Sequence, residues 1–508
     1  MKSRTLMCIT AITLFAALAI PVRLAAQHTR SKLIDIGTFG GPTSQTNGES
    51  VVITNEGTVV GGADTSTPCP YFSGLISPAF KWQNGVMTEL ALLPGGCFSF
   101  AGATNSHDGL IVGGADNGLI DPLTDVPELR AVIWQGGQII DLGTLGGSNS
   151  VADAVNNRGE VIGVAENTIP DPFDFGGTII EGLPSPTEWH AFLWQDGVMR
   201  DLGTLGGPDS AVAAVNERGQ IAGISFTNFT PNPTTGFPTL APFLWQNGKM
   251  LDLGTLGGSF GVSAHLNNRG QVVGFSDLAG DLAAHPYLWD GGRMTDLGVL
   301  GGTFGLANWI NNAGEVVGGS TTPDDQFHAV LWTHGGTTDL GTVDGDSCSI
   351  AFVNNSKGQI VGQSFNCDGS GEPRAVLWDK RGPIIDLNAF VPPGSDLQLV
   401  ESHFINDRGE IVVAGVLPNG DEHAVVLIPC GPNDSEVCED HSDSRAALTQ
   451  ANPAAAAQTS TNVTHGRLTP ETLAPCAPDG PVDITFVASE HQGSRSRGVA
   501  WSTRPTLS

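Results

Sequence analysis

Charge is scarce in this sequence, and positive charge is the scarcest. Only 15% of the residues are charged, and 23 lysines and arginines stand against 52 aspartates and glutamates, for a net charge of −29. A surface of this sign repels nucleic acid and anionic lipid at long range. We therefore expect neither as a partner. The acidity suits a highly soluble extracellular protein.

The apolar stretch at the N-terminus, residues 6–20, is shorter than the roughly 20 residues that a transmembrane helix needs. It follows the basic residues Lys2 and Arg4 and ends at Pro21. This order is typical of a signal peptide, here over residues 1–26. We expect export to the cell surface, the medium or the periplasm. The alternative is an uncleaved membrane anchor.

Cysteine spacings typical of zinc sites are also missing. Seven cysteines lie beyond the signal peptide, and export favours disulfides between them. Sequence proximity suggests the pairs Cys348–Cys367, Cys430–Cys438 and Cys69–Cys97, with Cys476 left over.

No cofactor is expected. The acidic segments 324–325 and 344–346 raise calcium as an alternative, because calcium prefers several oxygen ligands. Neither segment matches an EF-hand loop, and surface turns explain both.

What the chain has in abundance is one repeat, present eight times between residues 33 and 429. Its best copy begins with Asp-Leu-Gly-Thr-Leu-Gly-Gly (141–147) and ends with His-Ala-Phe-Leu-Trp (190–194). An Ala/Val-rich strand, a tight Asn-x-Arg-Gly turn and an apolar strand lie between. The eighth copy ends in Leu427 instead of tryptophan. The units lie near residues 33–82, 86–134, 138–194, 198–245, 249–289, 293–332, 336–378 and 383–428. The turn asparagines are Asn55, Asn105, Asn156, Asn216, Asn267, Asn311, Asn354 and Asn406.

The residue pattern of each unit predicts four short strands joined by tight turns. Asn-Gly and Asp-Gly pairs, as at 196–197 and 247–248, favour two-residue hairpins. A single sheet of this kind cannot bury both faces, whereas stacked copies can. Units of about 40 to 50 residues with four strands are typical of β-propellers. We predict an all-β fold, a propeller of about eight four-stranded blades, followed by a linker and a poorly ordered tail over 430–508. Seven blades, a β-solenoid and an open array are the alternatives.

The two ends of the repeat resemble the HAF family of bacterial extracellular repeat proteins, named after the tripeptide found here at 190–192. His-Ala-Val stands at 328–330 and 423–425, while 374–376 lacks the histidine. The resemblance covers about residues 33–429. It implies export and a surface or extracellular setting, and no particular chemistry. The pattern is more distantly similar to kelch propeller repeats, from which it departs by its Leu-Gly-Gly doublet and missing tyrosine.

Residues that recur from unit to unit are predicted to be structural, since a catalytic residue need not repeat. The aspartate of Asp-Leu-Gly accepts hydrogen bonds from turn amides, the histidine caps a strand, and the tryptophan fills space between blades. This set comprises Asp141, His190, Trp194, Asp201, Trp245, Asp252, Trp289, Asp296, His328, Trp332 and Trp378. No pair of carboxylates stands out as glycosidase chemistry would require.

The most irregular feature is the connection between the third and fourth strands of a unit. It is long in units 1 to 4 (63–78, 115–129, 165–189 and 225–241) and short in the others. Equivalent connections lie on one side of a propeller, so the long ones should form one binding face. The candidate ligand-binding residues are Tyr71, Phe72, Phe173, Phe175, Trp189, Phe226, Phe229 and Phe237.

These observations favour a secreted, non-enzymatic binding module whose ligand is a glycan or a protein. No catalytic residue is predicted. A propeller enzyme acting on polysaccharide and a structural envelope or matrix protein are the alternatives.

Overall fold

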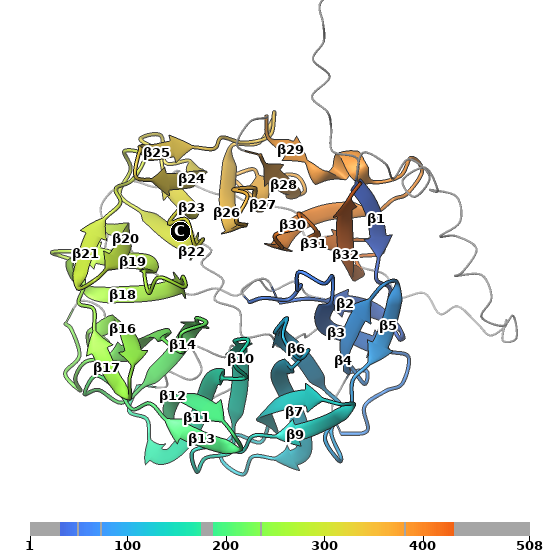
Figure 1. The fold of residues 1–508 in the computed structure, drawn as a ribbon, viewed down its shortest axis with the longest axis horizontal. Helices are drawn as coiled ribbons and strands as arrows, with labels where there is room; N and C mark the ends of the chain where they lie inside the picture. Colours follow the sequence, from blue (N-terminus) through green and yellow to red (C-terminus); the bar gives the residue numbers. More distant parts are fainter. Residues whose placement is uncertain are drawn as a thin grey trace, which may run out of the picture.

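The computed structural model describes residues 31–47, 50–71, 74–173, 186–233, 236–379 and 383–430. These residues form 32 strands and one short 3-10 helix, η1 (Leu387–Phe390). The strands make eight antiparallel blades of four, arranged as a ring with the first strand of each blade innermost (Figure 1). One parallel bridge, between Leu240 and Phe260, joins the fourth and fifth blades. The predicted all-β propeller is confirmed, with eight blades.

Each blade is ordered from its innermost strand to the strand at the rim. Blades 1 to 4 contain β2 (Gly40–Gln45), β3 (Val59–Thr65), β4 (Ala79–Gln83) and β5 (Val86–Glu89); β6 (Ser99–Thr104), β7 (Ile111–Ile120), β8 (Pro127–Gln135) and β9 (Gln138–Asp141); β10 (Ser150–Val155), β11 (Val161–Pro170), β12 (Thr187–Gln195) and β13 (Val198–Asp201); β14 (Ser210–Val215), β15 (Ile221–Phe226), β16 (Leu240–Gln246) and β17 (Lys249–Asp252). Blades 5 to 8 contain β18 (Gly257–Leu266), β19 (Val272–Leu278), β20 (Ala284–Asp290) and β21 (Arg293–Asp296); β22 (Gly305–Ile310), β23 (Val316–Thr321), β24 (Phe327–Thr333) and β25 (Gly336–Asp339); β26 (Cys348–Asn354), β27 (Ile360–Phe365), β28 (Arg374–Trp378) and β29 (Ile385–Asp386); β30 (Gln398–Ile405), β31 (Ile411–Val416), β32 (Glu422–Pro429) and β1 (Ser31–Asp35).

Blades and sequence units are offset by one strand. The strand that ends in tryptophan forms a hairpin with the Asp-Leu-Gly strand of the next unit, so that Trp82 lies opposite Met87. The connecting residues Asn84 and Gly85 both have positive φ, at 53° and 80°. This is the backbone of a type I′ turn, whose twist suits a tight hairpin. A blade is therefore three strands of one unit followed by the first strand of the next.

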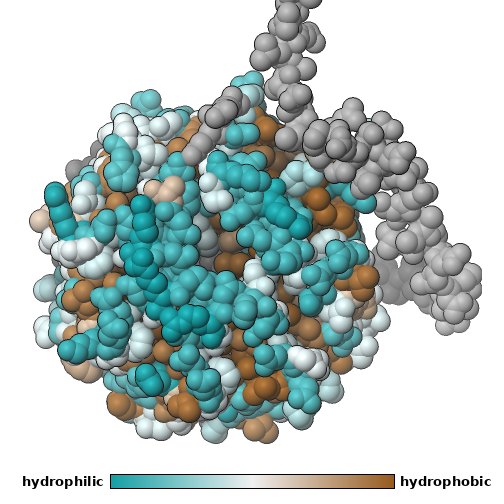
Figure 2. All heavy atoms as spheres, viewed as in Figure 1, coloured by the Kyte–Doolittle hydropathy of each residue, from teal (hydrophilic) through white to brown (hydrophobic). Residues whose placement is uncertain are grey.

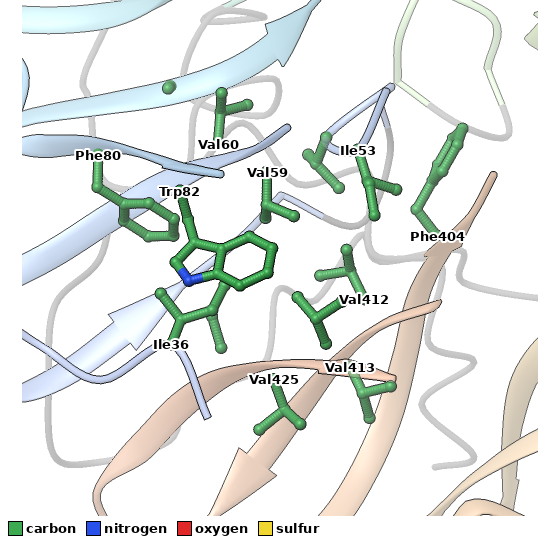
Figure 3. Close-up of a cluster of buried hydrophobic side chains, with 14 of the residues drawn as sticks. Ile36, Ile53, Val59, Val60, Phe80, Trp82, Phe404, Val412, Val413 and Val425 are labelled. Carbon is green, nitrogen blue, oxygen red and sulfur yellow. The ribbon is translucent and has the colours of Figure 1, made fainter. Parts of the chain in front are cut away.

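The offset closes the ring. Strand β1, from the N-terminal end of the repeat region, pairs antiparallel with β32 and completes blade 8. Ile36 and Trp82 pack there with Val413 and Val425 of the last blade (Figure 3). Residues far apart in sequence thus share the largest apolar cluster.

Packing between blades follows the repeat. Trp245 of blade 4 shares a core cluster with Ile162 and Leu193 of blade 3, and the same arrangement recurs around the ring. At Gly163 of β11 there is no room for a side chain, because a Cβ would overlap the Val151 carbonyl oxygen and the Phe192 ring. Trp194, unlike the other blade tryptophans of the repeat, is only half-buried.

The asparagine turns form a second link between blades. In Asn267 the side-chain oxygen accepts bonds from its own turn amides, while Nδ2 donates to the Asn311 carbonyl of the next blade at 3.1 Å. The same bond to the next blade recurs seven times around the ring, from Asn105, Asn156, Asn216, Asn267, Asn311, Asn355 and Asn406.

Two turn assignments made from the sequence are wrong by one residue. In unit 7 the turn residue is Asn355, because it bonds Gln359 and the Asn406 carbonyl, while Asn354 ends β26. In unit 1 the position is held by Thr54, whose carbonyl accepts from Asn406. In both places adjacent polar residues made the register ambiguous.

Disulfides join Cys69 to Cys97 and Cys348 to Cys367, as the spacing predicts. Cys430 is also disulfide-bonded, while Cys438 lies outside the described residues. Within the described ranges, no helix has the length and apolar character to cross a membrane. The predicted signal peptide at 1–26 and residues 431–508 of the predicted linker and tail also lie outside these ranges.

Candidate interaction face

The ring has two sides that differ in their connections. Because successive strands run antiparallel, the connection from second to third strand lies on the same side as the connection to the next blade. We call this side the loop face. The opposite side, which carries the asparagine turns and the hairpins to the outermost strands, is the turn face.

On the loop face, two of the long connections are mostly extended hairpins. Strands β7 and β8 in blade 2, and β11 and β12 in blade 3, run well beyond their neighbours' length. The segments 115–129 and 165–189, expected as loops, thus contain paired strand at both ends. The bridge between Ile120 and Pro127 leaves only a short turn in blade 2.

Two of the candidate aromatic residues belong to the core. Trp189 is fully buried and Phe226 is 2% exposed, so neither contacts a ligand directly. This corrects the sequence-based assignment. Both side chains pack into one apolar cluster with Val151 and Ile224 beneath the loop face.

The other candidates lie at the surface or near it. Phe229 and Phe237 are exposed, at 56% and 43%. The ring of Phe173 lies 6.0 Å from that of Phe226 and 6.4 Å from that of Phe237, which connects blades 3 and 4. Tyr71 is half-buried. Phe72 and Phe175 lie outside the described residues.

Sequence reasoning missed the aliphatic part of this face, because only aromatic residues were considered in the long connections. Five large aliphatic side chains are exposed on second-to-third-strand connections of blades 2, 3 and 5. Together with Phe229 and Phe237 they form what we call the apolar arc: Leu119, Ile120, Leu123, Ile169, Phe229, Phe237 and Leu282. Leu282 and Leu123 are the most exposed, at 71% and 67%.

The arc is confined to one part of the ring. Of the described residues, the other exposed large apolar side chains lie on outermost strands or beside them, as Val86 and Val198 do, or at Val51. None lies in the corresponding connections of blades 6 to 8. The side of the ring seen in Figure 2 is largely hydrophilic with separate hydrophobic areas. Large apolar side chains that are exposed only on this set of connections make them a candidate interaction site.

Several connections of the loop face are tied to those of a neighbouring blade. The Cys69–Cys97 disulfide and the hydrogen bond from Tyr71 to Asp116 connect blades 1 and 2. Asn232 of blade 4 donates to Asp281 of blade 5 at 3.3 Å. Such cross-links reduce the entropy that the connections would lose on binding.

The arc lies in acidic surroundings. Asp125 is exposed, and Glu128 and Asp281 are half-buried, beside or within its connections. On the described connections of the loop face in blades 2 to 5, Arg130 is the one lysine or arginine, and it pairs with Asp141 at 3.2 Å. The arginines of the asparagine turns lie on the turn face. The loop face here is therefore apolar and anionic.

Some carboxylates on the loop face have a structural role. Asp116 accepts bonds from the Cys97 and Phe98 amides, and Glu166 accepts from those of Ser148 and Asn149, so each fixes the start of an inner strand. In blade 4 the equivalent position is Phe226, the last residue of β15.

Asp209 is an exception among these acids. It is fully buried, Oδ1 accepts from the Trp189 amide at 2.9 Å, and Oδ2 has no hydrogen-bond partner among the residues that the structure describes. Burial, with the negative charges of Asp171 and Glu188, raises the pKa of Asp209 to about 8. The group is therefore largely protonated at neutral pH.

The recurring histidines and aspartates pair with each other. Nδ1 of His190 lies 2.9 Å from Asp201, and the same contact joins His285 to Asp296 and His328 to Asp339. Burial disfavours protonation of His190, but its hydrogen bond to Asp201 and the charge of that carboxylate prevail and raise its pKa. Each pair links two adjacent strands at the rim of a blade.

Trp309, which is not one of the repeat tryptophans, lies on β22, the innermost strand of blade 6. It stacks on His265 at 3.5 Å between ring centres and meets Phe404 edge-on at 5.4 Å, which connects β18, β22 and β30. Burial lowers the pKa of His265 to about 3, so its imidazole is neutral at physiological pH.

Within the described part of the chain, no three His, Cys, Asp or Glu side chains gather as a metal site. At the segments considered for calcium, Asp325 has a φ of 58° in a turn and Asp346 pairs with Arg374 at 3.6 Å.

Neither a family model nor a curated protein sequence matches this chain. Among solved structures it is similar to the β-propeller domain of the Trilobed protease from Pyrococcus furiosus, at 9% identity and a TM-score of 0.40, over 67% of this chain and 98% of that one. TolB from Acinetobacter baumannii matches at 11% identity and a TM-score of 0.28, over 74% and 80%. Trypanosoma rangeli sialidase matches at 10% and 0.28, over 78% and 59%. These similarities transfer no activity to this chain.

Proposed function

We propose that this protein is an exported, non-enzymatic interaction module of the HAF type, which binds a partner protein through the apolar arc. The observation that carries the proposal is the confinement of the arc to the loop face of blades 2 to 5. The cross-linked connections beneath it supply a preorganised surface.

A protein partner suits the arc better than a glycan. Five of its seven members are leucine or isoleucine, and the two phenylalanines carry no polar atom. Sugar recognition needs a few well-placed hydrogen-bonding groups, whereas the centre of a protein interface is apolar. The acidic residues around the arc would form the polar rim of this protein interface.

To test the proposal, peptide ligands are selected from a random display library, with the exported chain as the target. We expect selected peptides to lose at least about tenfold in affinity for the double variant Leu123→Asp/Phe229→Asp, because each carboxylate must be desolvated at the contact. The matched control is Val198→Asp, an exposed apolar residue on the rim strand β13. Circular dichroism establishes that all variants are folded.

Peptides that bind the double variant and the parent equally would refute the proposal. A glycan array on the same samples tests the second ligand class. Specific glycan binding that the arc substitutions leave unchanged would also contradict a protein-binding arc.

A further inference from the structure

The apolar arc and the carboxylates beside it favour a ligand that is both apolar and cationic. Its members are uncharged, and the carboxylates of Asp125, Glu128 and Asp281 lie in the same connections. The nearby Arg130 is shared between Asp141, at 3.2 Å, and Glu128, at 3.9 Å. Asp125 and Asp281 are therefore the carboxylates here without a lysine or arginine partner among the described residues. Charge complementarity therefore selects a partner segment with several arginines or lysines beside large apolar side chains.

This chain contains such a segment at its C-terminal end. Residues 494–504 carry Arg495, Arg497 and Arg504 together with Trp501. No aspartate or glutamate follows Glu490. The segment therefore carries a net charge of +3 in a chain of net charge −29. Tryptophan and arginine are also the residues that most often dominate binding energy at interfaces.

We propose that segment 494–504 docks on the apolar arc of its own chain and covers the surface to which the partner protein binds. The inference rests on the proposed function insofar as both use this surface. A partner must then displace the tail before it binds.

The tail is long enough for segment 494–504 to reach the apolar arc. About 56 residues separate Cys438, the predicted disulfide partner of Cys430, from Ser494. A flexible chain of that length has a root-mean-square span of roughly 37 to 45 Å. A compact fold of about 400 residues has a radius of gyration of roughly 21 Å. The segment can therefore reach both sides of the ring, at an effective concentration that favours binding within the molecule.

Limited trypsin digestion of the complete exported chain tests the docking. Arg495 and Arg497 belong to the proposed segment, while Arg445 and Arg467 lie in the same tail outside it and serve as internal controls. We expect initial cleavage at Arg495 and Arg497 to be at least about tenfold slower than at the two controls, since proteolysis follows the population of the undocked state. Released peptides are quantified by mass spectrometry.

Substitution of the arc should remove the difference. In Leu123→Asp/Phe229→Asp the four sites should be cleaved at similar rates, whereas Val198→Asp should retain the protection. Protection independent of protein concentration supports docking within one chain. Protection that appears only at high concentration would mean a tail from a second copy, and would overturn the proposal.

Equal cleavage at all four sites in the parent chain would also overturn it. That result leaves the proposed function standing if selected peptides still require the arc. If the arc substitutions change neither protection nor peptide binding, both proposals fail.

Discussion

In seven of the eight turns an asparagine uses both the oxygen and the nitrogen of its side-chain amide. Oδ1 of Asn267 accepts from the amides of Arg269 and Gln271, and Nδ2 donates to Gln271 and to the next blade. The side chain is 2% exposed, so each group has little access to water. Only asparagine offers two acceptor sites and two donors on so short a stem.

We expect Asn267→Ala to lower the free energy of unfolding by about 2 to 3 kcal/mol, because buried amides and the Asn311 carbonyl lose their partners. The neighbouring Asn268, which accepts from the exposed Glu217 amide, is the control, and its alanine variant should cost less than about 1 kcal/mol. Denaturant unfolding followed by tryptophan fluorescence measures both. Equal losses would contradict the role given to the buried amide.

At the scale of elements, neighbouring blades contact each other at one recurring pair of positions. One position lies on the third strand of a blade and the other on the innermost strand of the next. In five of the eight places an alanine amide donates to a serine Oγ of the next inner strand, as Ala191 does to Ser210 at 3.0 Å. Where proline replaces the alanine, as Pro242 and Pro286 do, glycine replaces the serine. Proline has no amide hydrogen, and its Cδ lies 3.0 Å from where a Cβ of Gly261 would be.

This coupling predicts a non-additive pair of substitutions. Gly261→Ser alone should destabilise the protein by about 1 to 3 kcal/mol through crowding against Pro242. Pro242→Ala/Gly261→Ser should recover most of that loss, because the new amide can donate to the serine as in blade 3. Thermal unfolding of the two single variants and the double variant yields the coupling energy. Additive effects would show that the two positions are independent.

At the scale of the whole molecule, contacts between the two ends of the repeat region close the ring. Strand β1 pairs with β32, and Asn406 donates across the seam to the Thr54 carbonyl at 2.9 Å. His423 contacts Asp35 at 2.9 Å, so the repeating pair is here formed between the two ends of the repeat region. The seam thus uses contacts that recur between and within the other blades.

The seam should carry a pH-dependent contribution. The hydrogen bond to Asp35, and then its charge, raise the pKa of His423 against the effect of burial. A raised pKa in the folded state stabilises the protein below the unfolded value, about 6.5, and the contribution disappears as the pH rises through the folded value.

His423→Gln should therefore cost more stability at pH 5.5 than at pH 9. The difference should not exceed about 1 kcal/mol, because Asp35 is 38% exposed and solvent screens the pair. Thermal unfolding at the two pH values measures it. A larger loss at pH 9 would contradict the assignment.

How much of this molecule could be predicted from its sequence depends on the range of the interactions involved. The strands, most of the turns and the blade number followed from the repeat, because Asn-Gly and Asp-Gly hairpins and apolar strands depend on residues within a few positions of one another. Two disulfides followed from proximity in the same way. The offset of blades from units did not follow, since a repeat has no intrinsic first strand.

The sequence by itself thus determined a ring of similar four-stranded blades, through contacts that each unit makes with the next. Only the tertiary structure decided which side chains of the long connections are exposed. Trp189 and Phe226 are buried because the packing of neighbouring blades encloses them, while Leu123 and Leu282 remain exposed on their hairpins. Exposure depends on neighbours from other blades, and a local pattern of apolar residues does not contain that information.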